Sequence, residues 1–187
     1  QHAPALAEVD PIQVHPLLLD LLSGDDEIFL STGDDFFFAG SGDDTVQGDD
    51  GYDTIVGDDG DDVLYTGGNE GPGAEDFHDE AFGQAGNDYI YAHSGKELIS
   101  GDGEEGSGSD TVSFAETDDG VVVSLAVEGV QAVRAGHIVE LVSIENLVGS
   151  SFNDVLTGTA SENSVYGGEG EDTLDGAGGE DVLDGNS

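Results

Sequence analysis

The sequence contains no cysteine, methionine or tryptophan, and Lys96 and Arg134 are the only basic residues apart from histidine among its 187 residues. Without cysteine, neither disulfides nor thiolate metal sites can form. Two cations stand against 43 acidic residues, a formal charge of −41, which excludes nucleic acid as a partner because phosphate binding needs basic side chains. No apolar run approaches the roughly 18 residues of a membrane-spanning helix.

Catalytic patterns are also missing. The sequence has neither an H-E-x-x-H nor a G-x-S-x-G motif. Its histidines have no spacing typical of ligands or triads: His2, His15, His78, His93 and His137. Only His78 has acids close by, and it is interpreted as a surface-loop residue. We therefore predict that the chain is not an enzyme.

What the sequence does contain is an aspartate every nine residues. Five of these lie two residues after a glycine and two before an apolar residue: Asp26, Asp35, Asp44, Asp53 and Asp62, after Gly24, Gly33, Gly42, Gly51 and Gly60, and before Ile28, Phe37, Val46, Ile55 and Leu64. A fixed short period predicts a solenoid, in which each unit buries its apolar side chain only by stacking on its neighbours. The same period builds columns of negative charge, and such columns need counter-ions.

The glycines permit a tight turn, and the apolar residue lies at the centre of a short strand. If two nonamers make one coil, each turn stacks on the one eighteen residues later. Asp26 is then expected near Asp44, and Asp44 near Asp62. Paired carboxylates and turn carbonyls form an all-oxygen shell, which suits Ca²⁺ better than Zn²⁺, Cu²⁺ or Mg²⁺.

The alternative is a solvated, salt-adapted acidic surface. Residues 24–65 hold 14 acids in 42 positions, whereas residues 113–148 hold 6 in 36. General surface acidity would not concentrate in glycine-rich turns and fix one aspartate to a period of nine, so calcium is favoured. Salt adaptation remains as an addition, because Asp25, Asp34, Asp43 and Asp61 exceed what the ligand positions require.

The period returns later in the chain and completes the set of expected calcium ligands. Its members are Asp26, Asp35, Asp44, Asp53, Asp62, Asp88, Asp110, Asp154, Asn163, Asp172 and Asp181, with turn carbonyls near Gly24, Gly33, Gly42, Gly51, Gly60, Gly167, Gly170 and Gly176. Asp154 is expected to pair with Asp172, and Asn163 with Asp181. Because Asn163 is neutral, its calcium site is expected to be weaker. Glu97 is one methylene longer than the aspartate of the other repeats, so calcium binding at its position is doubtful.

The repeats divide the chain into segments of one continuous solenoid domain. The expected segments are an apolar N-terminal arm (1–22), a first roll block (23–65), an acidic glycine-rich loop (66–82), a second repeat block (83–112), a block of short β-strands with hairpin-like connections (113–148) and a third roll block (149–187). The arm is interpreted as an end cap or, alternatively, as a strand that docks on another subunit.

The segment GGEGEDTLD at 167–175 matches the nonapeptide G-G-x-G-x-D-x-U-x of RTX proteins, and residues 143–185 resemble the C-terminal repeat blocks of bacterial RTX (hemolysin-type) proteins. The resemblance implies an all-β, right-handed parallel β-roll that binds several Ca²⁺ ions, export through a type I system, and folding outside the cell or at its surface. Leu21, Leu22 and Thr32 replace leading glycines in the first block, which predicts incomplete sites there.

Three functions remain open at this point. The first is a calcium-triggered folding and stabilising module of a larger secreted protein. The second is a subunit of an extracellular filament, surface layer or adhesin that associates head to tail through its solenoid ends. The third is part of a secreted enzyme whose catalytic domain lies elsewhere. The start at Gln1 and the absence of methionine predict a processed product or an excised fragment.

Overall fold

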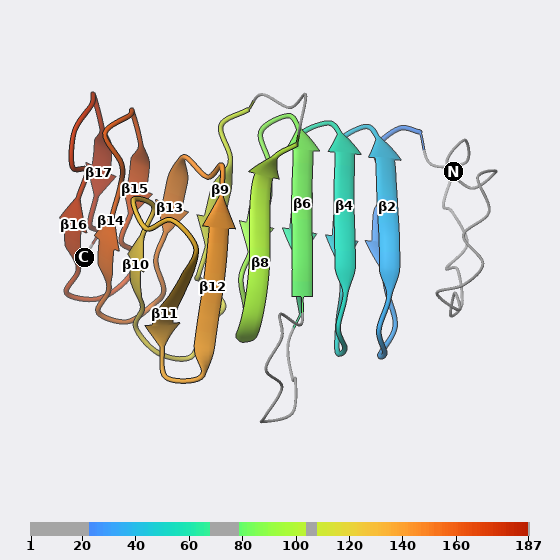
Figure 1. The fold of residues 1–187 in the computed structure, drawn as a ribbon, viewed down its shortest axis with the longest axis horizontal. Helices are drawn as coiled ribbons and strands as arrows, with labels where there is room; N and C mark the ends of the chain where they lie inside the picture. Colours follow the sequence, from blue (N-terminus) through green and yellow to red (C-terminus); the bar gives the residue numbers. More distant parts are fainter. Residues whose placement is uncertain (1–22, 68–78, 104–107, 187) are drawn as a thin grey trace.

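The computed structural model describes residues 23–67, 79–103 and 108–186, and these form an all-β solenoid without a helix. Seventeen short strands are arranged in three sheets. Figure 1 shows the coils stacked side by side along the long axis of the molecule. No segment of the described chain is a helix long and apolar enough to cross a membrane.

The longest sheet contains eight strands, and all neighbours in it are parallel. In spatial order they are β1 (Glu27–Phe29), β3 (Thr45–Gln47), β5 (Val63–Tyr65), β7 (Tyr89–Tyr91), β9 (Thr111–Ser113), β13 (Asn146–Val148), β15 (Ser164–Tyr166) and β17 (Val182–Asp184). Most of these strands are the three residues that follow the periodic acid, so one nonapeptide supplies one turn and one strand.

The opposite side of the roll is formed by a six-stranded and a three-stranded sheet. The six-stranded sheet has the order β11 (Val130–Arg134), β12 (His137–Val142), β8 (Gly95–Asp102), β6 (Asp79–Ala85), β4 (Thr54–Asp59) and β2 (Phe36–Ser41). The three-stranded sheet consists of β10 (Val122–Ser124), β14 (Val155–Thr157) and β16 (Thr173–Asp175). All pairs are parallel except the β11–β12 hairpin, which turns at Gly136 with a φ of 83°.

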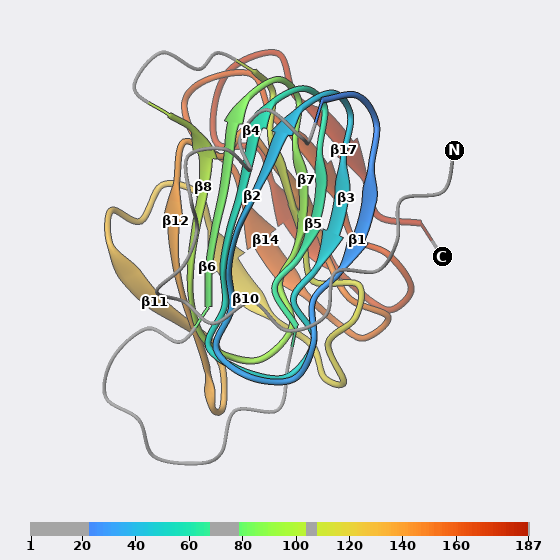
Figure 2. The same ribbon diagram turned by 90° about the vertical axis from the view of Figure 1, so that its right-hand side faces the viewer.

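Two nonapeptides make one coil, as the spacing predicted. Ile28 is in register with Val46, and Val46 with Leu64, at steps of eighteen residues. Consecutive nonapeptides alternate between the two sides of the roll, so Phe37 and Ile55 are register partners in the other sheet. Figure 2 looks along the stack, where the two sides enclose a narrow interior.

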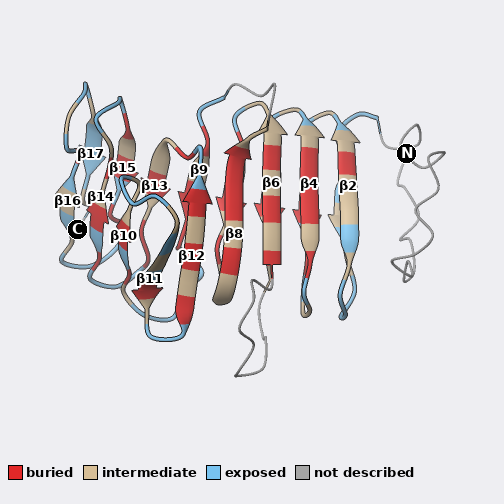
Figure 3. Ribbon diagram, viewed as in Figure 1, coloured by how far each residue is buried: buried red, intermediate tan, exposed pale blue. Residues whose placement is uncertain are grey.

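The interior is filled by the apolar residues of the repeat. Fully or almost fully buried members are Val46, Ile55, Leu64, Ala81, Ile90, Ile99, Val112, Leu147, Leu156 and Val165. The burial falls off toward the last coils, where β16 and β17 are drawn mostly exposed in Figure 3 and Leu183 is 47% exposed. Each coil therefore depends on its neighbours for burial.

The segments that interrupt the period are absorbed without breaking the sheets. The step from β5 to β7 is 26 residues instead of eighteen, yet Leu64 and Ile90 remain in register. Strand β6 begins at Asp79, inside the segment expected as a loop, because Ala81 is buried in the core. Residues 68–78 of that loop and the expected N-terminal arm (1–22) lie outside the described residues.

The expected strand block (113–148) contains β10 to β13 and begins at the last residue of β9, Ser113. Three of these strands continue the solenoid: β13 joins the eight-stranded sheet, β12 pairs in parallel with β8, and β10 starts the three-stranded sheet. A true hairpin connects only β11 and β12. The β-branched, alternating sequence therefore supplies a further coil together with one antiparallel edge strand.

Candidate metal centre

The periodic acids form two columns, one along each edge of the roll, because consecutive nonapeptides alternate sides. Each member of the first column immediately precedes a strand of the eight-stranded sheet: Asp26, Asp44, Asp62, Asp88, Asp110, Glu145, Asn163 and Asp181. The second column serves the other two sheets: Asp35, Asp53, Asp79, Glu97, Asp154 and Asp172. The nine-residue period of the sequence is thus an eighteen-residue period within each column.

Neighbouring members of a column contact one another through backbone and carboxylate. The N–H of Asp26 donates to Asp44 Oδ1 at 2.8 Å, and the N–H of Asp44 donates to Asp62 Oδ1 at 2.8 Å. The other pairs expected at eighteen residues are made in the same way: Asp35 to Asp53, Asp154 to Asp172 and Asn163 to Asp181. The predicted offset is therefore confirmed, and one oxygen of each carboxylate holds the preceding coil.

The second oxygen of several of these carboxylates is buried and accepts no hydrogen bond. This holds for Oδ2 of Asp44, Asp62, Asp88, Asp110 and Asp172. A buried polar atom without a partner costs roughly 1–3 kcal/mol, and more when it is charged. Repeated along a column, such oxygens indicate positions for a cation rather than isolated packing defects.

Glycine lets each carboxylate lie against the turn of its own repeat. A Cβ added to Gly57 would collide with Asp62 Oδ2, and one added to Gly83 would collide with Asp88 Oδ2. The turns also stack closely on one another: at Gly60, whose φ is 141°, a Cβ would collide with the carbonyl oxygen of Gly42. The glycines thus bring carboxylate and turn backbone close together at both edges.

Burial makes these carboxylates difficult to ionise in the ion-free protein. Loss of solvation raises the pKa of Asp62 and of Asp88 to about 7 and that of Asp110 to about 6, which the backbone hydrogen bonds offset only in part. It also raises the pKa of Asp44. A bound cation would reverse this effect, because an opposite charge close to a carboxylate favours its ionised form.

Two members of the columns, Asp154 and Asn163, have their side-chain oxygens occupied by protein donors. Asp154 accepts hydrogen bonds from Ser150 N and Oγ and from Val121 N. Asn163 Oδ1 accepts from the N–H and hydroxyl of Thr159. Ser150 and Thr159 stand where the nonapeptide has its second glycine. Their hydroxyl groups bind the oxygens whose counterparts in other repeats, such as Oδ2 of Asp172, have no donor.

Glu97, at which calcium binding was doubtful from the sequence alone, also has a hydrogen-bond partner at both oxygens. Oε1 accepts from Thr66 Oγ1 at 2.6 Å and from the N–H of His93 at 2.9 Å. Oε2 lies 2.6 Å from His137 Nε2, and both side chains are fully buried. Neither oxygen of Glu97 is without a protein partner, unlike Oδ2 of Asp62.

Sequence reasoning missed two column members, Asp79 and Glu145. Asp79 Oδ1 accepts from Asp53 N, and Glu145 Oε2 accepts from Asp110 N. Asp79 lies nine residues before Asp88 and two before an apolar residue, which was a usable signal. Neither acid has the repeat glycine two residues earlier. Before Glu145 this position is Ser143, which adopts the positive φ of 50°.

The acids that exceed the ligand positions form an outer ladder. Asp43 N donates to Asp25 Oδ1, Asp61 N to Asp43 Oδ1 and Asn87 N to Asp61 Oδ1, all at exposed positions. This ladder runs in the opposite sense to the buried columns, since each carboxylate accepts from the following coil. Hydrogen bonds between coils therefore give these additional acids a structural role, which is an alternative to salt adaptation.

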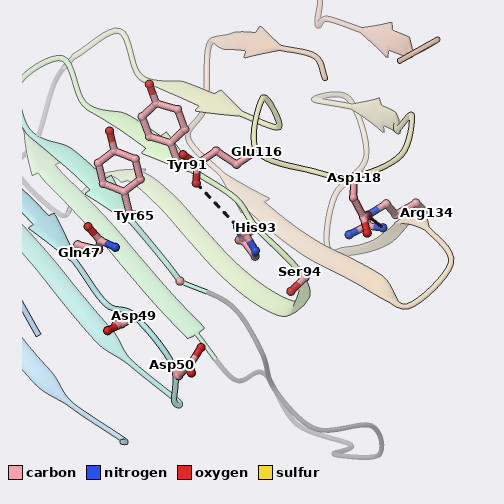
Figure 4. Close-up of a pocket in the computed structure, with 11 residues that line it drawn as sticks. Gln47, Asp49, Asp50, Tyr65, Tyr91, His93, Ser94, Glu116, Asp118 and Arg134 are labelled. Carbon is pink, nitrogen blue, oxygen red and sulfur yellow. Dashed lines mark hydrogen bonds and ion pairs between the residues drawn. The ribbon is translucent and has the colours of Figure 1, made fainter. Parts of the chain in front are cut away.

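A groove of about 780 Å³ lies at the edge of the roll where strands β3, β5 and β7 end, opposite the first column (Figure 4). The rings of Tyr65 and Tyr91 stack on one of its walls, with centroids 4.4 Å apart. Across the groove, His93 Nδ1 lies 3.8 Å from Glu116 Oε2, and Arg134 pairs with Asp118. These contacts pair four of the titratable side chains that line the groove, and Asp49 and Asp50 line it as well.

The columns fit a hard cation that prefers oxygen ligands. Within the described ranges, no three acidic or histidine side chains converge on one point, so an ion would draw on carboxylates of the column together with turn carbonyls. Mixed shells of carboxylate and carbonyl oxygens are typical of Ca²⁺, which tolerates flexible geometry.

Comparison with known proteins agrees with this chemistry. Four copies of the model for the RTX calcium-binding nonapeptide repeat match the chain, at residues 19–46, 38–70, 74–104 and 148–186. A search of the curated proteins found no match. Repeats of this family bind Ca²⁺, and the all-β roll with its glycine-rich turns is the fold that they form. The chain belongs to the family of RTX calcium-binding nonapeptide-repeat proteins.

Proposed function

We propose that the chain is an extracellular calcium-binding roll that folds when it binds Ca²⁺ and acts as the structural module of a protein secreted by a type I system. The observation that carries the proposal is the row of buried carboxylate oxygens without hydrogen-bond donors, at Asp44, Asp62, Asp88 and Asp110. With a formal charge of −41, the ion-free chain repels itself and disfavours the compact state.

The residues proposed to hold the ions are the column members with a donor-free oxygen, Asp44, Asp62, Asp88, Asp110 and Asp172, joined by Asp26, Asp35, Asp53, Asp79 and Asp181. When bound, calcium supplies positive charge between coils. The chain contributes the carboxylates, the glycines that admit them to the turns, and backbone N–H groups that orient them. Binding free energy then becomes folding free energy, because the unfolded chain has no preformed site.

The test is folding as a function of calcium. The β-type circular dichroism signal is expected to appear on titration with Ca²⁺ and to collapse on addition of a chelator at low ionic strength, while Mg²⁺ at the same concentration replaces it poorly. Isothermal titration at constant pH counts the ions. A chain that remains fully folded in chelator, or that binds no calcium, contradicts the proposal.

A second function, end-to-end assembly, is favoured by the exposure of the last coil. Val182 is 53% and Leu183 47% exposed on β17, the last strand of the eight-stranded sheet in the described chain. A strand edge with exposed apolar residues invites pairing with another strand. Light scattering in calcium tests this: Leu183→Asp should reduce any association, whereas Phe152→Asp, an exposed turn residue, should not. A wild-type protein that stays monomeric at high concentration in calcium contradicts assembly.

A further inference from the structure

The second column of acids is interrupted after Glu97. Asp79 and Glu97 are register partners in the six-stranded sheet, and the partner of Glu97 on the next strand, β12, is Val139. Val139 is fully buried and apolar. The coil that follows Glu97 therefore brings no carboxylate to the column, and an ion at this boundary would lack the second acid that other coils provide.

That next coil contributes an imidazole instead. His137 is the first residue of β12 and pairs in register with Gly95. Its Nε2 lies 2.6 Å from Glu97 Oε2, with both side chains completely buried. Since an ionised carboxylate only accepts hydrogen bonds, Nε2 carries the proton and donates it. Phe114 covers the imidazole, with ring centroids 5.8 Å apart.

The remaining donors come from residues that follow two strands of the eight-stranded sheet. Thr66 follows β5 and His93 follows β7, and both bind Oε1 of Glu97. Asp62 in the first column forms the contrast, because its Oδ1 accepts one N–H and its Oδ2 accepts none. Both oxygens of Glu97 therefore have a protein partner, whereas Oδ2 of Asp62 has none and is left for an ion.

We propose that His137 caps the second column and replaces calcium at this coil boundary, so that the pairing of β8 with β12 forms and persists without the ion. The proposal rests on the proposed function, since it takes calcium to bind the column members named there and withholds it from Glu97. It divides the second column into two separate arrays, Asp35 to Asp79 and Asp154 to Asp172, with an ion-free joint between them.

Hydrogen exchange in the full chain, at constant pH and with excess chelator, tests the joint directly. Amides of β8 and β12 are expected to retain protection that amides of β2 and β4 lose. Equal, fast exchange of all four strands in the wild-type chain overturns the proposal. In saturating calcium all four strands should be protected, which provides the reference.

His137→Gln is expected to lower the protection of β8 and β12 in chelator by about a hundredfold, because it removes one partner of a buried pair. The matched control is His93→Gln. Only the backbone N–H of His93 binds Glu97, and its ring turns toward Glu116 (Figure 4), so protection should be unchanged. Equal effects of the two substitutions, or no effect of His137→Gln, count against the cap.

The number of bound calcium ions separates failure of the cap from failure of the proposed function. Glu97→Gln should leave the number unchanged in equilibrium dialysis, whereas Asp62→Asn should lower it. If Glu97→Gln lowers the number, Glu97 is a calcium ligand and the cap is wrong. If the wild-type chain binds no calcium at all, the proposed function is wrong. The exchange experiment then shows only whether His137 holds β8 and β12 together without an ion.

Discussion

The backbone N–H of Asp44 lies 2.8 Å from Oδ1 of Asp62, eighteen residues later, while Oδ2 of Asp62 is buried and accepts no hydrogen bond. One carboxylate thus holds two coils together and still has an unused acceptor in the interior. The hydrogen bond fixes where the carboxylate lies, and the free oxygen makes this position unfavourable without a cation. Calcium dependence therefore follows from the same contact that stacks the coils.

Replacing Asp62 by asparagine should weaken calcium-dependent folding. Asn keeps an oxygen to accept the Asp44 N–H, but it removes the charge that the ion requires. We expect the calcium concentration at the folding midpoint to rise by about tenfold or more, the size seen when groups that support a metal site are changed. A calcium titration followed by circular dichroism measures the shift.

Asp61→Asn is the matched control for this substitution. Asp61 is adjacent and exposed, carries the same charge, and accepts the N–H of Asn87 through Oδ1, which an amide oxygen can also do. Its midpoint should change little, since exposed charges are screened. Equal shifts for the two variants would mean that overall charge, and not a site at Asp62, sets the calcium dependence.

Gly57→Ala should destabilise the calcium-loaded roll for a purely steric reason. The added Cβ would collide with Asp62 Oδ2, although φ at this position is not in the left-handed region. Overpacking of this kind costs about 1–3 kcal/mol, and displacement of the carboxylate should also raise the calcium midpoint. Gly178→Ala, whose Cβ would meet nothing closer than 3.8 Å, should be close to neutral in urea unfolding. A neutral Gly57→Ala would show that the carboxylate does not need this position.

Much of this arrangement could be read from the sequence, and what could not has identifiable physical causes. The period of nine predicted the alternating coils and the inward apolar residue, because glycine turns and strand geometry are local. The sequence could not show that His137, forty residues away, binds the carboxylate of Glu97. That contact depends on the pairing of β12 with β8, which local sequence does not specify. Asp79 and Glu145 escaped because neither has the expected glycine two residues earlier.

Ser150→Ala should make the third block more dependent on calcium. The Ser150 hydroxyl donates to Asp154 at 2.9 Å, and its removal leaves the buried carboxylate with fewer donors. The free energy of unfolding at low calcium should fall by about 1–2 kcal/mol, and the difference from wild type should shrink as calcium rises. Ser151→Ala, at an exposed turn position, should leave the unfolding curve unchanged. A deficit that persists undiminished at saturating calcium would indicate that the hydroxyl acts only on packing.

Acid should substitute in part for calcium. Burial raises the pKa of Asp62 and Asp88 to about 7 and that of Asp110 to about 6. Between the ordinary value near 4 and these raised values, the folded chain binds more protons than the unfolded chain. Stability without calcium therefore falls as pH rises through this window and increases as pH is lowered.

In chelator, the β-type circular dichroism signal is thus expected to be larger at pH 5.5 than at pH 8, and calcium affinity should decline over the same interval because protons compete for the same oxygens. The ordinary pKa of an aspartate or glutamate side chain lies near 4, below this interval, so the interval reports on carboxylates whose pKa is raised by burial. The triple variant Asp62→Asn, Asp88→Asn, Asp110→Asn should flatten the pH dependence. If the ion-free wild-type signal instead decreases on acidification from pH 8 to 5.5, these carboxylates are not the groups that calcium relieves.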